Sequence, residues 1–276
     1  AYSLEIVFEW LVAQSLGKTP RFQGSFTHLV HFLLPAHITA MAVSMLLFTN
    51  ERLMPMILAT AIAVLSKVIF RVAIGGRSRH FLNPSNTGIA LVLILFPWVG
   101  IAPPYHFTEN IAGTLDWMLP AIIILSGSFL NWRFTKKLPL ILAWLAGFVL
   151  QAALRSWWFD SSFIAGLIPM TGMAFLLFTF YMVSDPATTP VKRSQQIGFG
   201  LAVAAVYGVL MMAHIVFGLF FALFGVCLVR GGYFALVNFV EGIYTDRPAN
   251  PADIKTALAI KTIEKETQFN TDMRGS

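Results

Sequence analysis

The chain has 276 residues, of which 57% are hydrophobic and only 12% are charged, and its mean hydropathy is +0.72. These values exclude an ordinary water-soluble globular protein and predict a polytopic membrane protein. Its apolar runs are continuous rather than alternating, which predicts helical spans and not barrel strands. The net charge of +6 arises in short loops between apolar runs, so it indicates orientation, and nucleic acid is not an expected partner.

Residues 1–27 are expected to hold an interfacial helix or part of a further span. A transmembrane domain is expected over residues 28–244, with eight to ten helices, because the stretch 231–244 either lies in the interface or crosses. The eight clearer spans are expected at 28–48, 54–72, 83–98, 118–131, 138–155, 163–183, 197–212 and 214–230. Residues 245–276 predict a cytoplasmic tail, and its final MRGS resembles a remnant of an expression vector.

The single cysteine, Cys227, excludes an intramolecular disulfide and an iron-sulfur cluster held by this chain alone. The six histidines show no metal spacing and are expected to be interfacial, although His37 is notable as an ionisable group inside a predicted span. No metal ligand is therefore predicted.

Lys and Arg gather in alternate loops between the predicted spans, and the longest opposite loop, 99–117, has neither residue. The positive-inside rule then predicts a protein of the inner (plasma) membrane with both termini in the cytoplasm.

A first polar motif occupies residues 75–98, IGGRSRHFLNPSNTGIALVLILFP. Asn83 is the expected helix N-cap and Pro84 the first helical residue. The unpaired N–H groups of such a helix attract anions, and Arg77, Arg79 and His80 add charge and donors. The motif predicts a site for phosphate or for the polar edge of an isoalloxazine.

A second motif, Asp185-Pro186-Ala187-Thr188-Thr189, matches Asn83-Pro84-Ser85-Asn86-Thr87 about a hundred residues later. Pro190 fits poorly inside a helix, so we expect a turn that ends at Thr189, with Thr189 as the cap of a helix begun by Pro190. For both motifs an alternative stays open, in which each is a capped loop whose cations only follow the inside-positive bias.

The two motifs are four predicted spans apart, which gives both the same direction through the membrane. We therefore predict a parallel internal repeat, 54–155 against 163–244, around one binding centre. Chance similarity between the motifs is the alternative.

Three segments carry a resemblance to a known family, and they read RHFLNPSNTGIALVLILFP, GSFLNWRFTKKLPLILAWLAGF and FYMVSDPATTPVKRSQQIGFG. Over about residues 50–240 the chain resembles the membrane subunits RnfD, of the Rnf complex, and NqrB, of the sodium-pumping NADH:quinone oxidoreductase. The resemblance implies an all-α, repeat-built membrane fold akin to urea and ammonium channels. It also implies flavin-dependent electron transfer between partner subunits.

One departure concerns the segment on which members of the larger complexes join FMN to a threonine. Here the interval reads PYHFTENIAGTLDWMLP, where Thr114 is the sole candidate for covalent flavin. The chain is more similar to the divergent stand-alone branch, which includes accessory proteins of enediyne biosynthesis. Noncovalent flavin, as FMN or riboflavin, is the expected cofactor.

These observations favour a flavin-associated electron-transfer protein of the membrane. The candidate cofactor-binding residues are Arg77, Arg79, His80, Asn83, Asn86, Thr87, Asp185, Thr188, Thr189, Lys192 and Arg193. Two alternatives stay open, namely a transporter or channel for a small polar or anionic solute, and an accessory subunit that anchors a biosynthetic partner. The expected partners are the lipid bilayer and redox or biosynthetic subunits, with a homo-oligomer as a further option.

Overall fold

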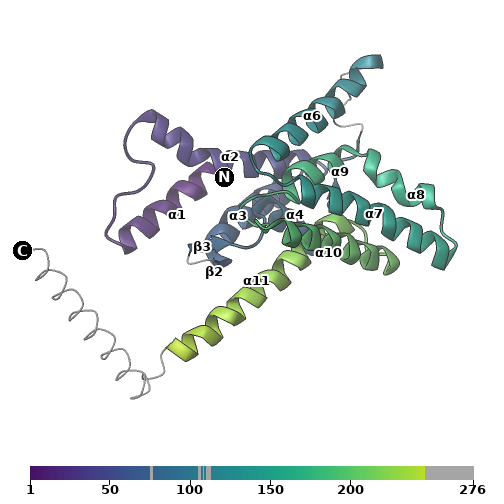
Figure 1. Cartoon of the computed structure of the whole chain (residues 1–276). Helices are drawn as coiled ribbons and strands as arrows, with labels where there is room; N and C mark the ends of the chain where they lie inside the picture. Colours follow the sequence, from purple (N-terminus) through teal and green to yellow (C-terminus); the bar gives the residue numbers. More distant parts are fainter. Residues whose placement is uncertain (75–76, 105–106, 108, 110–112, 246–276) are drawn as a thin grey trace, which may run out of the picture. The chain divides into compact units, whose positions relative to one another are not determined.

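The computed structural model describes residues 1–74, 77–104, 107, 109 and 113–245 (Figure 1). The predicted tail lies beyond these residues from position 246 onward. The chain divides into two compact units, Ala1–Tyr233 and the segment that follows. In the second unit, the described residues continue the last helix, and every contact discussed below lies within the first unit.

Four helices make up the N-terminal part of the first unit. α1 (Tyr2–Ser15) packs beside α2 (Phe26–Leu46), and α3 (Leu53–Ile69) packs closely along α4 (Pro84–Leu95), as Figure 1 shows. The hydroxyl group of Tyr2 lies 2.5 Å from Nδ1 of His37, eleven residues into α2. The expected N-terminal helix therefore exists, and its first turn lies beside the middle of α2.

Two short antiparallel strand pairs connect these helices. β2 (Arg71–Ile74) and β3 (Arg77–His80) form a hairpin between α3 and α4, with Arg71 opposite His80. β1 (Leu47–Phe48) pairs with β4 (Gly100–Ile101) and so joins the C-terminal ends of α2 and α4.

The next part begins with a 3-10 turn, η1 (Gly113–Trp117), that leads into α6 (Met118–Arg133) and then α7 (Leu138–Phe159). Asp160, which has a left-handed φ of 51°, ends α7. Pro139 stands in the first turn of α7, where its missing N–H costs no hydrogen bond.

A broken helix follows, built from α8 (Phe163–Leu167), the 3-10 turn η2 (Ile168–Thr171), α9 (Met173–Leu177) and the π-helical turn η3 (Phe178–Met182). Its two halves are bent by 71° at Gly172, whose backbone is extended.

The chain then forms α10 (Arg193–Met212), which packs along α7, and α11 (Gly218–Thr245).

Within the described residues, five helical segments are long and apolar enough to cross a membrane, and the bent pair would make six. They are Phe26–Leu46, Gly113–Arg133, Leu138–Phe159, Arg193–Met212 and Gly218–Val240. The chain is therefore a multi-pass α-helical membrane protein, as the sequence predicts.

The predicted count of eight to ten spans is wrong. α3 has 17 residues and α4 has 12, so α4 is about 18 Å long against a hydrocarbon core of about 30 Å. The apolar residues of α4 are explained by burial inside the protein, because all residues from Pro84 to Ala90 are buried. The stretch 231–244 adds no crossing either, since it continues α11 as one helix.

Aromatic side chains fill the core between α7, the broken helix and α10. The fully buried Trp144 and Phe148 contact Phe175, and Phe148 stacks on Tyr207 at a centroid distance of 4.9 Å. The indole N–H of Trp144 donates to the hydroxyl of Thr179 at 3.0 Å, so its polar atom is satisfied inside the core. This packing fixes the broken helix against α7 and α10.

Gly88 allows α3 and α4 to approach closely. An ideal Cβ at this position would lie 2.2 Å from the carbonyl oxygen of Ala59 and 3.1 Å from the Cβ of Ala63. Small residues at such crossings let helix backbones pack in a membrane. The position of the first motif, at the start of α4, depends on this contact.

We predict that Gly88→Ala lowers the free energy of unfolding by about 1–3 kcal/mol, because the methyl group forces α3 and α4 apart. The measurement is the thermal midpoint of the protein purified in detergent. Gly198→Ala is the matched control, since Gly198 is an exposed residue of α10 with no atom within 4 Å of an ideal Cβ. Its midpoint is expected to stay level or rise with helix propensity. Equal midpoints for both variants would contradict the close contact.

Candidate functional site

The predicted cap of the first motif is confirmed. Oδ1 of Asn83 accepts a hydrogen bond from the backbone N–H of Asn86 at 3.0 Å, and Pro84 stands in the first turn of α4. The hydroxyl group of Ser85 also donates to Oδ1 of Asn83 at 3.0 Å. Two donors at the start of α4, the N–H of Asn86 and the hydroxyl of Ser85, are thus bound by Asn83.

The second motif is a turn built on Asp185. Its Oδ1 accepts from the backbone N–H of Ala187 at 3.0 Å, and its Oδ2 accepts from the hydroxyl of Thr188 at 3.0 Å. The hydroxyl and the N–H of Thr189 both donate to the carbonyl oxygen of Asp185. Asp185 therefore accepts four hydrogen bonds from the residues that follow it, and these bonds hold the turn together.

The predicted helix start at Thr189 and Pro190 is wrong. α10 begins at Arg193 with Lys192 as its N-cap, and no side chain caps it. The hydroxyl of Thr189 is already bound to the carbonyl of Asp185, so it is not available to cap a helix that follows.

The two motifs meet. Nδ2 of Asn83 donates to Oδ2 of Asp185 at 3.3 Å and to the carbonyl oxygen of Met182 at 3.4 Å. The cap of α4 and the turn after the broken helix therefore form one hydrogen-bonded group, 102 residues apart in the sequence.

Two cations hold the carbonyl groups of the second motif. Lys137, which is 2% exposed, donates from Nζ to the carbonyl of Pro190 at 2.6 Å and to that of Thr189 at 3.4 Å. Nη1 of Arg230 donates to the carbonyl of Thr188 at 2.7 Å. Burial lowers the pKa of Lys137 to about 8, although the charge of Asp185 acts in the opposite direction.

A cavity of about 500 Å³ lies beside the point where the motifs meet. Its polar lining includes His80, Asn83, Ser85 and Asp185, with Lys67 also at its wall. Burial lowers the pKa of His80, partly offset by the charge of Asp185, which favours the neutral imidazole at neutral pH. The apolar lining comes from α2 and the broken helix, namely Pro35, Ile38, Met41, Ala42, Met45, Leu46, Leu177 and Met182.

The predicted site residues divide by position. His80, Asn83 and Asp185 line this cavity. Asn86, Thr87, Thr188 and Thr189 do not line it; they are buried and form hydrogen bonds to the backbone or to Asp185. Arg79 is exposed on β3, and the side chain of Arg77 lies outside what the structure describes. Lys192 and Arg193 are exposed at the start of α10.

Arg193 lies at a different, smaller cavity of about 330 Å³, together with Trp132, Lys136 and Gln196. Thr114 is exposed in η1, beyond the N-terminal end of α6, and it does not line the larger cavity. The structure therefore does not bring Lys192, Arg193 and Thr114 to the cavity where the motifs meet.

Sequence reasoning missed three residues that organise the site: Asn131, Lys137 and Arg230. Nδ2 of Asn131 donates at 2.9 Å to the carbonyl of Phe180, which lies in the π-helical turn. In the sequence, Lys137 and Arg230 are basic residues of predicted loops, and as such they indicate only the orientation of the chain in the membrane. The one available signal was the position of Lys137 directly before the Leu138-Pro139 helix start, and the adjacent Lys136 shares that signal although it is exposed.

Among the described residues, no group of three or more His, Cys, Asp or Glu side chains is placed to hold a metal ion. No protein-family model and no curated protein matches the chain.

The lowered pKa of Lys137 predicts a pH-dependent stability. Between about 8 and the ordinary value of 10.5, the unfolded chain binds a proton at this residue that the folded protein does not bind, so stability rises with pH in this window. We expect the thermal midpoint of the wild type in detergent to rise across this window relative to that of Lys137→Gln, which keeps an N–H donor without titrating. Lys136→Gln, at an exposed neighbour, should keep the wild-type profile. Parallel profiles for the wild type and Lys137→Gln would contradict the assignment.

Proposed function

We propose that the protein is a membrane electron-transfer protein that binds a flavin noncovalently in the 500 Å³ cavity beside Asn83 and Asp185. The observation that carries the proposal is the combination of a mostly apolar lining with a small group of convergent polar residues. Pockets of about 300–1,000 Å³ with this composition are typical of small-molecule and cofactor sites.

The polar lining suits the pyrimidine edge of an isoalloxazine, which alternates carbonyl oxygens with an N–H group. In the proposed complex Asp185 accepts from the flavin N–H, and His80 donates to a flavin carbonyl. Asn83 holds Asp185 in place from α4, because its amide already donates to the carboxylate. The apolar face of the ring system would pack against Ile38 and Met182.

Charge near the cavity would set the potential of the bound flavin. Reduced flavin is anionic near neutral pH. Lys67 lies at the cavity wall, where Glu5 pairs with its Nζ at 3.4 Å and balances its charge, and Asp185 adds negative charge. The binding is proposed as noncovalent, because Thr114 does not line the cavity.

The proposal includes a location in the inner (plasma) membrane with both termini in the cytoplasm. It is supported by basic residues that lie outside the candidate spans, since Arg71 begins the β2–β3 hairpin and Lys137 lies between α6 and α7, bonded to the second motif, as the positive-inside rule expects for one membrane face.

A transporter for a small polar or anionic solute is a second candidate, and the broken helix favours it. Helices interrupted near a polar meeting point between two halves are typical of solute sites in secondary transporters. The bent pair, Phe163–Thr171 and Met173–Met182, ends at the junction of the motifs, and the short α4 begins there.

The flavin proposal is tested by blocking the cavity. Ala187 is exposed and lines the cavity next to Asp185, so Ala187→Trp should obstruct the ligand with little effect on folding. We expect protein purified in mild detergent, or incubated with FMN or riboflavin, to retain flavin in a fixed ratio, and Ala187→Trp to lose at least nine-tenths of it. The measurement is the visible absorbance of flavin per protein.

Ala213→Trp is the matched control, because Ala213 is exposed at the C-cap of α10 and does not line the cavity. It should retain flavin like the wild type. Wild-type protein that neither carries flavin nor binds it on incubation would refute the proposal.

Transport is tested in proteoliposomes that contain the protein without a redox partner. An electron carrier should show no flux of small anions in the wild type or in Ala187→Trp. Flux that is present in the wild type and in Ala213→Trp but lost in Ala187→Trp would favour the transporter.

A further inference from the structure

A separate cavity of about 430 Å³ lies between α1 and the last turns of α3. It shares no lining residue with the cavity proposed for flavin. Its polar lining consists of Glu5, Glu9, Lys18, Thr19, Arg21 and Arg71. Charged groups beside apolar helices of a membrane protein are costly unless each one is paired or hydrated.

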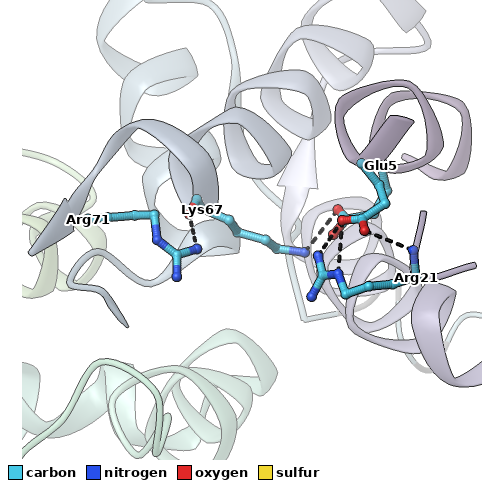
Figure 2. Close-up of polar contacts among 5 residues, drawn as sticks. Glu5, Arg21, Lys67 and Arg71 are labelled. Carbon is cyan, nitrogen blue, oxygen red and sulfur yellow. Dashed lines mark hydrogen bonds and ion pairs between the residues drawn. The ribbon is translucent and has the colours of Figure 1, made fainter. Parts of the chain in front are cut away.

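Both carboxylates of this cavity are already paired, as Figure 2 shows for Glu5. Glu5 lies 3.4 Å from Nζ of Lys67. Glu9 accepts from Nε and Nη2 of Arg21 at 2.9 Å and 2.6 Å, and from the backbone N–H of Arg21 at 2.9 Å. These hydrogen bonds hold the pKa of Glu9 below its usual range, so both residues of this pair stay charged.

Lys18 and Arg71 remain as cations in excess. Among the described residues, the guanidinium group of Arg71 donates to neutral acceptors, the hydroxyl and carbonyl of Ser78 and the carbonyl of Lys67. These bonds use three of its five N–H groups and leave two for another acceptor. Lys18 is exposed, and within the described chain it forms no ion pair.

The walls of the cavity are apolar. α1 contributes Phe8 and Val12, its C-cap residue Leu16 adds to them, and α3 contributes Val64 and Val68. Val12 is 41% exposed and Leu16 is 61% exposed, so the apolar wall continues onto the outer surface of α1. A ligand that fills the cavity therefore meets both these two cations and hydrocarbon surface.

We propose that this cavity binds an anionic phospholipid, with its phosphate between Lys18 and Arg71 and its acyl chains along Val12 and Leu16. Guanidinium and ammonium groups bind phosphate oxygens well, and basic pockets beside membrane helices bind the headgroups of anionic lipids. A free phosphate would leave the apolar wall uncovered, which is the reason for assigning the site to a lipid. The bound lipid would link α1 to α3.

The test is native mass spectrometry of the full chain released from detergent that contains equal amounts of phosphatidylglycerol and phosphatidylcholine. We expect wild-type protein to retain one phosphatidylglycerol in preference to phosphatidylcholine. Lys18→Gln should weaken retention about fivefold, the usual effect of one basic residue near an anionic lipid surface, and Lys18→Gln with Arg71→Gln should abolish the preference. Lys136→Gln, at an exposed lysine of the α6–α7 loop, is the matched control and should retain lipid like the wild type.

Glycerol 3-phosphate and inorganic phosphate are added as competitors to identify the source of the phosphate. Failure of both to displace the lipid at millimolar concentration supports the lipid site. Displacement of the lipid by inorganic phosphate, added as the single competitor, would overturn the lipid site. Equal retention of the two lipids by the wild type would overturn it as well. Unchanged retention in the double variant would also overturn it. Circular dichroism of each variant checks that the helices are intact.

Discussion

The structure depends on how one non-helical stretch, Ser184–Lys192, satisfies its backbone inside a membrane protein. Its residues Thr188–Pro190 are buried, and a buried backbone group without a hydrogen-bond partner is costly, so the rest of the protein must supply partners. Here Lys137 and Arg230 supply donors to three successive carbonyl groups, and Asp185 accepts from the N–H that follows it. Because these partners come from different helices, the same bonds that satisfy the stretch also fix α7 and α11 around it.

Asn83 extends this arrangement to the other half of the chain. One amide side chain caps α4 through its oxygen and binds Asp185 through its nitrogen. The cavity beside it therefore combines a rigid polar end with side chains of α2, which line it without taking part in the hydrogen-bonded group. For the proposed flavin, such an arrangement would hold the polar edge of the ring in a fixed place and leave the apolar wall to determine whether the ring fits.

The sequence predicts what depends on local chemistry and average apolarity. The membrane class follows from composition, and the cap at Asn83 follows from the Asn-Pro pair alone. The span count was wrong because hydropathy does not distinguish burial in lipid from burial in protein, and α4 is buried in protein. The cap at Thr189 was wrong because its hydroxyl binds Asp185, and the buried Lys137 cannot be told from the exposed Lys136 without the fold. Whether flavin binds, and whether the chain contains a repeat, stay predictions.

The π-helical turn at Phe178–Met182 determines how the broken helix is anchored. The N–H of Val183 donates to the carbonyl of Phe178, five residues earlier, so the turn contains one residue more than an α-turn. Two carbonyl groups of this turn accept from amide side chains of other helices, that of Phe180 from Asn131 and that of Met182 from Asn83. Because Tyr181 and Met182 also line the cavity, this side of its wall is braced both by α6 and by the start of α4.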